Sequence, residues 1–239
     1  MTPVKTRYST KRLNSSSKSR LSSRHLIFAD YDRTLFDTSR FTATLIAVLS
    51  DRFGIDEEQF ETSMPDFSEP QNGYNLFAHT TSYGCEKAAV INALQALDTM
   101  EFLYTDSPAF IESLLANKSV SLQITTTGFT NYQQFKTTGL RQKYPQLPVT
   151  ILDQNKGRWL ADQWPRHVPP YVFERQSYEH VSLIDDSLVN LLPLLGFADI
   201  SLYQLQRPET KYLASDSRIP TFVSLEAVYQ SITKNSLRS

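Results

Sequence analysis

The sequence predicts an α/β protein whose mainly parallel sheet is covered by helices on both faces. From residue 107 onward, short apolar runs rich in β-forming residues alternate with helical patterns. A mainly helical stretch, 39–105, separates the first predicted strand, 25–30, from the second, 120–125. Strands that alternate with helices usually pair in parallel, and the helices between them cover both faces of the sheet. We therefore expect one α/β unit with a helical insertion after its first strand.

The first predicted strand brings two carboxylates to the edge of this sheet. Its apolar run from Leu26 to Ala29 ends at Asp30, and Asp32 and Thr34 follow closely. Ligands of open α/β sheets bind at the carboxyl ends of the strands. Two acids so close repel each other, so they need a cation or separate roles in which only one is ionised. Taken alone, the segment also fits an ordinary strand end with an Asx-type turn.

Two later segments add groups that suit an anion. Strand 120–125 runs into Thr126, Thr127 and Gly128, where hydroxyls and a glycine turn can contact a phosphate group. Lys156 follows a short apolar strand, 148–152. A lone lysine is usually a solvated surface charge, so only its position after a strand makes it a candidate.

The fourth segment repeats the pattern of the first. An apolar strand, 181–185, ends in adjacent acids, Asp185 and Asp186. The two strand ends together supply four carboxylates to a protein whose net charge is only −1. Hard oxygen ligands of this kind suit Mg²⁺, which commonly takes one or two carboxylates together with substrate phosphate.

Together, these four segments resemble the motifs of the haloacid dehalogenase-like (HAD) hydrolase superfamily. The matches, in chain order, are Asp-x-Asp-x-Thr at 30–34, a strand that ends at Thr126, the lysine Lys156, and the acid pair Asp185-Asp186. Each motif is common by itself, whereas the ordered set is specific and covers most of residues 24–230. The resemblance implies a Rossmann-like core with an inserted helical cap, as in the helical-cap phosphatases of the superfamily. Arg33 departs from the pattern, because the superfamily often has glycine at that position.

The resemblance also implies a division of the chain. Residues 24–37 and 106–239 correspond to the HAD-like core, and residues 38–105 to the helical cap. Caps of this kind close over the site, exclude water and select the substrate. Three side chains of the cap segment are candidates for substrate selection or, equally, for packing the cap helices together: Tyr74, Phe77 and His79.

The activity that the resemblance implies is Mg²⁺-dependent hydrolysis of a small phosphate monoester through an aspartyl-phosphate intermediate. Asp30 would be the nucleophile, which divides one difficult displacement into two easier ones. Asp32 would protonate the leaving oxygen and then activate the attacking water. The expected partner is therefore a small phosphorylated metabolite.

The resemblance implies binding roles for the remaining motif residues. The phosphoryl oxygens would contact Thr126, Thr127 and Lys156. If Lys156 lies outside the site, Arg158 is the nearest substitute. The Mg²⁺ ion would be held by Asp30, the backbone carbonyl of Asp32, Asp185 and Asp186.

Two other functions fit the same motifs. A phosphomutase or another phosphotransferase would use these residues with a second substrate in place of water. A non-catalytic binding protein would keep the fold and lose turnover. Dehalogenation is disfavoured, because the second acid, Asp32, and the pair Asp185-Asp186 favour Mg²⁺-dependent phosphoryl chemistry. The chain contains neither a Gly-x4-Gly-Lys-Ser/Thr nor a Gly-x-Ser-x-Gly motif, which argues against P-loop nucleotide hydrolases and serine hydrolases.

Charge is distributed unevenly along the chain. Residues 1–24 contain seven basic residues and no acid, which leaves 17 basic against 25 acidic residues in the remainder. Segment 1–23 is also rich in serine, so a disordered basic tail is expected. A transit peptide or a nucleic-acid-binding arm would fit the charge, but the poor apolar face and the single aromatic residue favour neither.

The remaining composition narrows the setting. The single cysteine, Cys85, excludes an intramolecular disulfide and suits a reducing, cytoplasmic location. No apolar run is long enough to span a membrane, so no membrane partner is expected. The four histidines are scattered without zinc-ligand spacing. The sequence indicates no oligomeric state.

Overall fold

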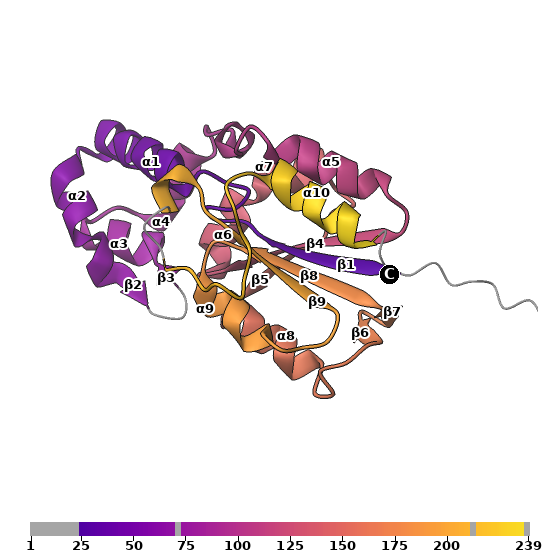
Figure 1. Ribbon diagram of the computed structural model, residues 1–239. Helices are drawn as coiled ribbons and strands as arrows, with labels where there is room; N and C mark the ends of the chain where they lie inside the picture. The colour runs from indigo at the N-terminus through magenta and orange to yellow at the C-terminus, as the bar shows by residue number, and fades with distance from the viewer. Residues whose placement is uncertain (1–23, 70–72, 211–213, 237–239) are drawn as a thin grey trace, which may run out of the picture.

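The computed structural model describes residues 24–69, 73–210 and 214–236. The predicted basic tail, 1–23, lies outside the described residues. The described part contains a six-stranded parallel sheet with helices on both faces, and a mainly helical unit lies beside one end of the sheet (Figure 1).

The first strand of the chain lies in the middle of the sheet. The strand order is β10-β9-β8-β1-β4-β5, and all neighbouring strands are parallel. Because β1 lies between β4 and β8, the carboxyl ends of these three strands meet at one edge. The α/β, Rossmann-like architecture predicted from the sequence is confirmed. The strands are β1 (His25–Asp30), β4 (Val120–Thr127), β5 (Val149–Leu152), β8 (His180–Asp185), β9 (Ile200–Leu205) and β10 (Thr221–Phe222).

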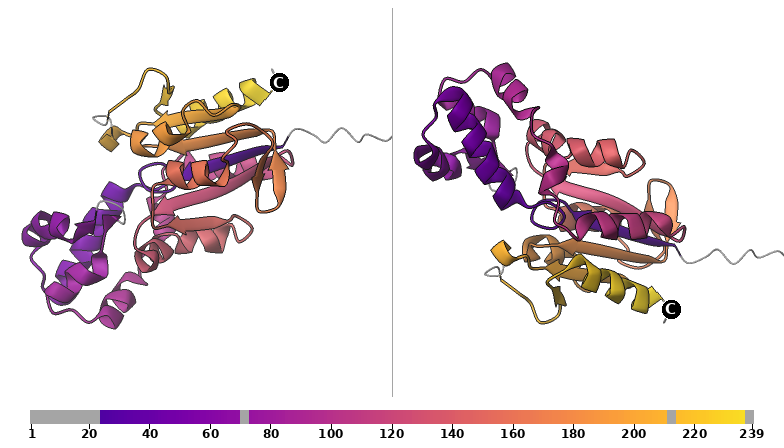
Figure 2. Two further views of the ribbon diagram at one scale, coloured as in Figure 1. Left: turned by 90° about the horizontal axis from the view of Figure 1, so that it is seen from below. Right: turned by 90° about the horizontal axis from the view of Figure 1, so that it is seen from above.

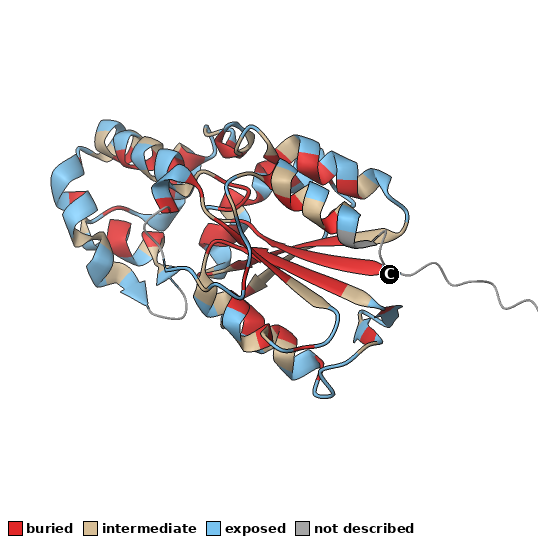
Figure 3. Cartoon of the chain, viewed as in Figure 1, coloured by how far each residue is buried: buried red, intermediate tan, exposed pale blue. Residues whose placement is uncertain are grey.

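Two layers of helices cover the sheet. The strands between these layers are mostly buried and are drawn in red in Figure 3. One layer contains α5 (Ser107–Ala116) and α10 (Leu225–Ser236), and the other contains α8 (Lys156–Gln163) and α9 (Leu188–Leu191).

Alternate residues of β1 face these two layers. Ile27 and Ala29 belong to the hydrophobic cluster that includes α5 and α10, whereas Leu26 and Phe28 belong to the cluster that includes α8 and α9. A parallel strand that is buried on both faces has no polar side, which explains why β1 is a continuous apolar run.

The segment between β1 and β4 forms the mainly helical unit, which Figure 2 shows displaced to one side of the sheet. The chain leaves and returns side by side, since Asp37 N donates to Phe102 O at 2.7 Å and Tyr104 N donates to Leu35 O at 3.0 Å. The mainly helical insertion is thus confirmed as a feature of the fold, while its role as a cap and its boundaries at 37/38 and 105/106 stay predictions. Its elements are α1 (Thr38–Phe53), α2 (Glu57–Ser63), α3 (Leu76–Ser82), α4 (Lys87–Leu94) and the strand pair β2 (Ser68–Glu69) and β3 (Gly73–Tyr74).

Helix α1 shows how local sequence sets these elements. The Asp37 carboxylate accepts a hydrogen bond from Arg40 N at 2.9 Å, which caps the first turn. Gly54 ends the helix with a left-handed φ of 67°, a conformation that glycine adopts at little cost. Phe41, Leu45 and Leu49 recur at helical spacing and are fully buried.

Three stretches have structure that their local sequence pattern does not indicate. Residues 65–84 contain α3, which is too short to show a helical apolar period. Residues 130–143 form two successive helices, α6 (Thr130–Lys136) and α7 (Thr138–Lys143). Their junction is fixed from outside, because the Thr99 hydroxyl accepts a hydrogen bond from Gly139 N at 2.9 Å. Between residues 160 and 180, a short hairpin forms from β6 (Tyr171–Phe173) and β7 (Gln176–Tyr178).

One candidate for substrate selection lies in the interior of the cap. His79 is fully buried, and its ring stacks between those of Phe60 and Phe67 at 3.9 and 4.3 Å. Both ring nitrogens are used, one with Ser63 Oγ and the other with Tyr74 Oη, each at 2.8 Å. His79 therefore packs the cap, which corrects the substrate-contact alternative for this residue.

A second buried histidine makes stability dependent on pH. His25 Nε2 lies 2.8 Å from Ser182 Oγ inside the sheet. Burial lowers the pKa of His25 to about 4, and the neighbouring His180 adds to this shift. An unfolded histidine has a pKa near 6.5, so between about pH 6.5 and pH 4 the unfolded state binds more protons than the folded state. Stability should therefore fall as the pH falls through this range.

We expect the wild-type protein to lose about 2 kcal/mol more of its free energy of unfolding than His25→Gln between pH 7 and pH 5. Urea denaturation at the two pH values measures this difference. His167→Asn, at an exposed histidine, is the matched control and should keep the wild-type pH dependence. Equal losses in wild type and His25→Gln would show that His25 does not cause the effect.

Among the described residues, no helix is both long and apolar enough to cross a membrane.

Candidate active site

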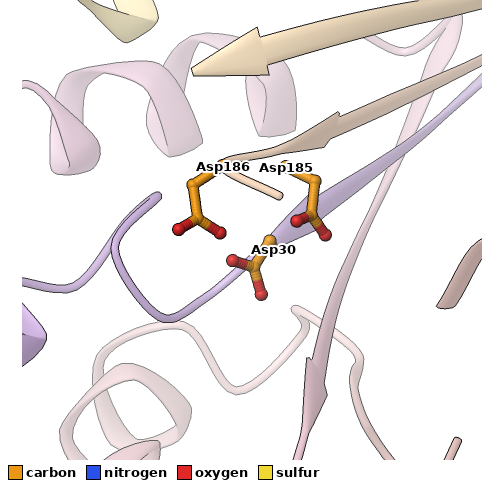
Figure 4. Close-up of side chains that lie close together, drawn as sticks. All are labelled: Asp30, Asp185 and Asp186. Atoms are coloured by element: carbon orange, nitrogen blue, oxygen red, sulfur yellow. The ribbon is translucent and has the colours of Figure 1, made fainter. Parts of the chain in front are cut away.

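The carboxylates predicted at two strand ends lie together at the carboxyl edge of the sheet. Asp30 ends β1, and Asp185 ends the neighbouring strand β8, with Asp186 directly after it. One carboxylate oxygen from each of the three lies within 4.8 Å of the others (Figure 4). All three side chains are buried. The three acids, which the sequence analysis placed at the ends of two strands, lie at one edge of the sheet because β1 and β8 are neighbours.

Lys156 lies within this group of acids. Its ammonium nitrogen is 2.6 Å from Asp30 Oδ1 and 2.9 Å from Asp185 Oδ2. Burial by itself works to lower the pKa of Lys156, but the neighbouring carboxylates of Asp185 and Asp30 outweigh burial and raise it. The lysine is therefore a fixed positive charge. Arg158, the possible substitute, is exposed at the rim of the same cleft.

The start of α8 positions this lysine. Asn155 caps the helix, because its Oδ1 accepts from Arg158 N at 2.9 Å and its Nδ2 donates to Val189 O at 2.9 Å. Gly157 then lets α8 lie directly against α9, since a Cβ atom there would collide with the carbonyl of Asn190.

The single positive charge of Lys156 does not neutralise the charges of three buried carboxylates. Burial raises the pKa of Asp30 well above its ordinary value; Lys156 opposes this shift, and the nearby acids add to it. Burial and the charge of Asp185 raise the pKa of Asp186 to about 7.

Asp185 and Asp186 also differ in their hydrogen bonds. Asp185 accepts from Asn190 Nδ2 and from Ser187 N, whereas the Asp186 carboxylate faces the cleft with no hydrogen bond to the described residues.

This donor set fits a hard divalent cation. The oxygens come from three buried carboxylates. Burial raises the pKa of two of them, Asp30 and Asp186, and the Asp186 carboxylate has no hydrogen-bond partner among the described residues. Asp30 and Asp186 are the residues best placed to hold such an ion, with Asp185 fixed beside them by Lys156.

The loop after β1 holds Asp30 from its other side. Thr34 Oγ1 donates to Asp30 Oδ2 at 3.1 Å, so Thr34 orients the carboxylate. Arg33 has a left-handed φ of 58°, which explains why glycine is favourable at this position. The Arg33 side chain is exposed, lines the cleft and acts to lower the pKa of Asp186.

Asp32 lies apart from the acid group, with a separate set of partners. Its Oδ1 accepts from Thr38 Oγ1 at 2.8 Å and from the Lys136 ammonium. Its Oδ2 accepts from Gln133 Nε2 at 3.1 Å and from Thr126 Oγ1 at 3.2 Å. Burial works to raise the pKa of Asp32, but the Lys136 charge and these hydrogen bonds outweigh it and lower the pKa. The Asp32 carboxylate is thus stabilised in its ionised form.

The two threonines of the second motif differ in their contacts. Thr126 Oγ1 is engaged with Asp32, whereas Thr127 Oγ1 is buried without a hydrogen-bond partner among the described residues. Both threonines line a cleft of about 1740 Å³, together with Asp30, Asp32, Lys156 and Asp186. The cap contributes further lining, including Ile46, Glu61 and Tyr74. The cleft therefore lies between the sheet edge and the cap.

Sequence reasoning missed Lys136 and Gln133, which hold Asp32. Both lie on α6, three residues apart, and so point to the same side of the helix. The available signal was this spacing on a helix that begins directly after the second motif.

Comparison with known proteins identifies the class of fold. No protein-family model matches the sequence, and no curated protein matches it significantly. Many solved structures match the described fold, and their common description is HAD-like hydrolase. The chain therefore has the HAD-like hydrolase fold, as its motifs suggested.

Three of these structures illustrate the likeness. A protein described as a haloacid dehalogenase-like hydrolase from Burkholderia xenovorans LB400 has a TM-score of 0.66 at 16% identity, covering 89% of this chain and 98% of its own. The HAD hydrolase YfnB from Bacillus subtilis, bound to magnesium, has a TM-score of 0.54 at 17% identity, covering 88% and 98%. The L-2-haloacid dehalogenase from Xanthobacter autotrophicus has a TM-score of 0.52 at 11% identity, covering 89% and 99%.

Proposed function

We propose that this protein is a Mg²⁺-dependent phosphatase that hydrolyses a small phosphate monoester through an aspartyl-phosphate intermediate. The observation that carries the proposal is the buried group of Asp30, Asp185 and Asp186 around Lys156, at the base of a cleft under the cap. Three acids with one lysine favour a bound divalent cation, and the magnesium bound to YfnB, which shares this fold, supports the same ion.

Asp30 is the proposed nucleophile. Lys156 and Thr34 hold its two carboxylate oxygens, at 2.6 and 3.1 Å, so that the carboxylate is fixed toward the cleft. Attack of Asp30 on phosphorus forms the acyl phosphate and breaks the bond to the ester oxygen, which leaves with the alcohol. Water then cleaves the acyl phosphate, which frees Asp30 and releases inorganic phosphate. Mg²⁺, when bound by Asp30, the Asp32 backbone carbonyl and Asp186, would supply charge that lets an anionic ester approach these acids.

The other residues of the cleft have proposed roles in binding the phosphoryl group and in proton transfer. Lys156 offsets the charge that builds on the transferred group, and the unpartnered hydroxyl of Thr127 offers a donor to a phosphoryl oxygen. Thr126 contributes by orienting Asp32. In this proposal, Asp32 handles the proton of the leaving oxygen and of the attacking water.

Dehalogenation is the main alternative reaction, because a haloacid dehalogenase shares the fold. Such chemistry needs a nucleophilic carboxylate, but it does not need a pair of further acids beside the nucleophile. The Asp186 carboxylate lies next to Asp30 and has no hydrogen-bond partner among the described residues, which instead favours metal-assisted phosphoryl transfer. A phosphotransferase would use the same groups, with an acceptor alcohol in place of water.

The test is phosphate release from p-nitrophenyl phosphate and from a panel of sugar phosphates, nucleotides and small phosphorylated metabolites, with Mg²⁺ or with chelator. We expect release that requires Mg²⁺. Asp186→Asn should raise the Mg²⁺ concentration that gives half-maximal phosphate release by at least about 10-fold. Asp153→Asn, at an exposed acid in the loop before α8, is the matched control and should behave as wild type.

Other outcomes point to the alternatives. Halide release from 2-haloacids in the presence of chelator, without phosphate release from esters, would contradict the proposal in favour of dehalogenation. Transfer of the phosphoryl group to an added alcohol faster than to water would favour a phosphotransferase. Binding of Mg²⁺ without turnover of any compound would favour a binding protein.

A further inference from the structure

Asp32 is bound by an unusually complete set of donors for a group that must exchange protons with substrate. Two donors reach each carboxylate oxygen, from the start of α1, from the end of β4 and from α6. Among the described residues that bind it, Lys136 is the one with a charge. Hydroxyl and amide donors orient a carboxylate, but a buried cation is what compensates its charge.

Lys136 is tied to the loop after β1 through both its backbone and its side chain. The side chain is 3% exposed and ion-paired to Asp32, and the backbone carbonyl accepts from Tyr31 Oη at 2.8 Å. The ammonium also lies over the rings of Tyr132 and Phe36, at 5.1 and 5.7 Å from their centroids. These contacts give the lysine one position, against Asp32.

Gln133 connects the same carboxylate to the end of β4. Its Nε2 donates to both Asp32 Oδ2 and the Thr127 carbonyl, at 3.1 and 3.0 Å, while its Oε1 is buried without a partner in the described structure. Because Gln133 and Lys136 lie three residues apart on α6, one short helix holds both oxygens of Asp32.

We propose that Lys136 is a positioning residue that fixes the Asp32 carboxylate in the orientation needed to serve the leaving-group oxygen. This inference rests on the proposed phosphatase function, because that function is what requires Asp32 to face the leaving-group oxygen. In the first step, Asp30 forms a bond to phosphorus, the bond to the leaving oxygen breaks, and that oxygen takes one proton from the Asp32 carboxyl group. In the second step, water attacks phosphorus and returns one proton to Asp32, while the bond between phosphorus and Asp30 breaks.

A role in the leaving-group step has a kinetic signature that a purely structural role lacks. The leaving group p-nitrophenolate is stable without a proton, whereas an alkoxide is not. Loss of the group that orients proton transfer should therefore slow hydrolysis of alkyl phosphates much more than that of p-nitrophenyl phosphate. General loss of folded protein would slow both equally.

The experiment compares Lys136→Met, Lys136→Arg and wild type on p-nitrophenyl phosphate and on the alkyl monoester that wild type hydrolyses fastest. For Lys136→Met we expect kcat to fall about 100-fold on the alkyl ester and less than about 10-fold on the aryl ester. Lys136→Arg should recover part of the loss on the alkyl ester. Lys143→Met, at a half-exposed lysine on α7, is the control and should behave as wild type. Equal losses on both esters would overturn the proposed role.

Crystal structures of Lys136→Met and Lys136→Arg test the positioning independently of turnover. The Asp32 carboxylate should leave Gln133 and Thr126 in the methionine variant and keep them in the arginine variant. An unchanged carboxylate in Lys136→Met would overturn the inference. If wild type hydrolyses no phosphate ester, the proposed function fails, and the crystal structures alone then decide whether Lys136 positions Asp32.

Discussion

Replacing Asp30 with asparagine should abolish phosphate release and at the same time make the metal-free protein more stable. Removal of a nucleophile should lower kcat on the order of 10⁴-fold or more. The stability gain follows from the raised pKa of Asp30, because burial and the nearby acids disfavour its ionised form in the folded state. In the unfolded chain the same carboxyl ionises freely above its ordinary pKa, so at pH 7 the wild type bears a cost that the neutral amide avoids.

We expect the gain to be roughly 1 kcal/mol, measured by chemical denaturation at pH 7 with chelator present. Lys156 keeps Asp185 as a partner in the variant, so the lysine is not left unpaired. Added Mg²⁺ should stabilise wild type more than Asp30→Asn, because the variant lacks one of the carboxylates that hold the ion. Asp162→Asn, at an exposed acid on α8, is the matched control and should change neither activity nor stability. Full activity in Asp30→Asn would exclude the proposed nucleophile.

Replacing Arg207 with methionine should destabilise the protein by about 3 kcal/mol, because it breaks a buried ion pair that holds the loop after β1. Arg207 is 5% exposed, and its guanidinium pairs with both oxygens of Asp106 at 2.8 and 3.0 Å. The same group donates to the Thr34 carbonyl at 2.8 and 3.2 Å. Asp106 also accepts from Leu225 N at 2.9 Å, so this cluster joins β1, α5 and α10.

Guanidinium chloride denaturation measures this loss. Arg218→Met is a suitable control, since Arg218 forms an ion pair with Asp216 on the surface and its removal should change stability far less. Arg207→Lys should also destabilise, because an ammonium cannot reproduce the planar fork that reaches Asp106 and Thr34 together. Losses of the same size in Arg207→Met and Arg218→Met would show that the buried cluster does not stabilise this loop.

The sequence predicted the strands that carry the site because each has a strong local signal. An apolar run that ends in acids, as at Asp30 and Asp185, indicates a buried strand with its polar end at the sheet edge. The parallel order of β8, β1 and β4 then brings these ends together, so the neighbourhood of Asp30, Asp185 and Asp186 followed from topology. Lys156 could be predicted as a site residue because it lies shortly after a predicted strand.

The partners of Asp32 could not be predicted in the same way. A helix such as α6 can present Gln133 and Lys136 to many surfaces, and only its packing beside the loop after β1 selects Asp32. The same limit applies to Arg207, whose partner Asp106 is distant in the chain. Side-chain pairs of this kind depend on the tertiary arrangement, for which a single sequence holds no periodic signal.

The central position of β1 has a consequence for how the chain folds. His25 pairs with Val120 on one side and with His180 on the other, so both neighbours of this apolar strand are made long after it during synthesis. Closing the sheet requires contacts between distant parts of the chain, which slows folding and prolongs the exposure of an aggregation-prone segment. The first strand of the core is therefore synthesised before both of its neighbours and can be fully buried only after they have been made.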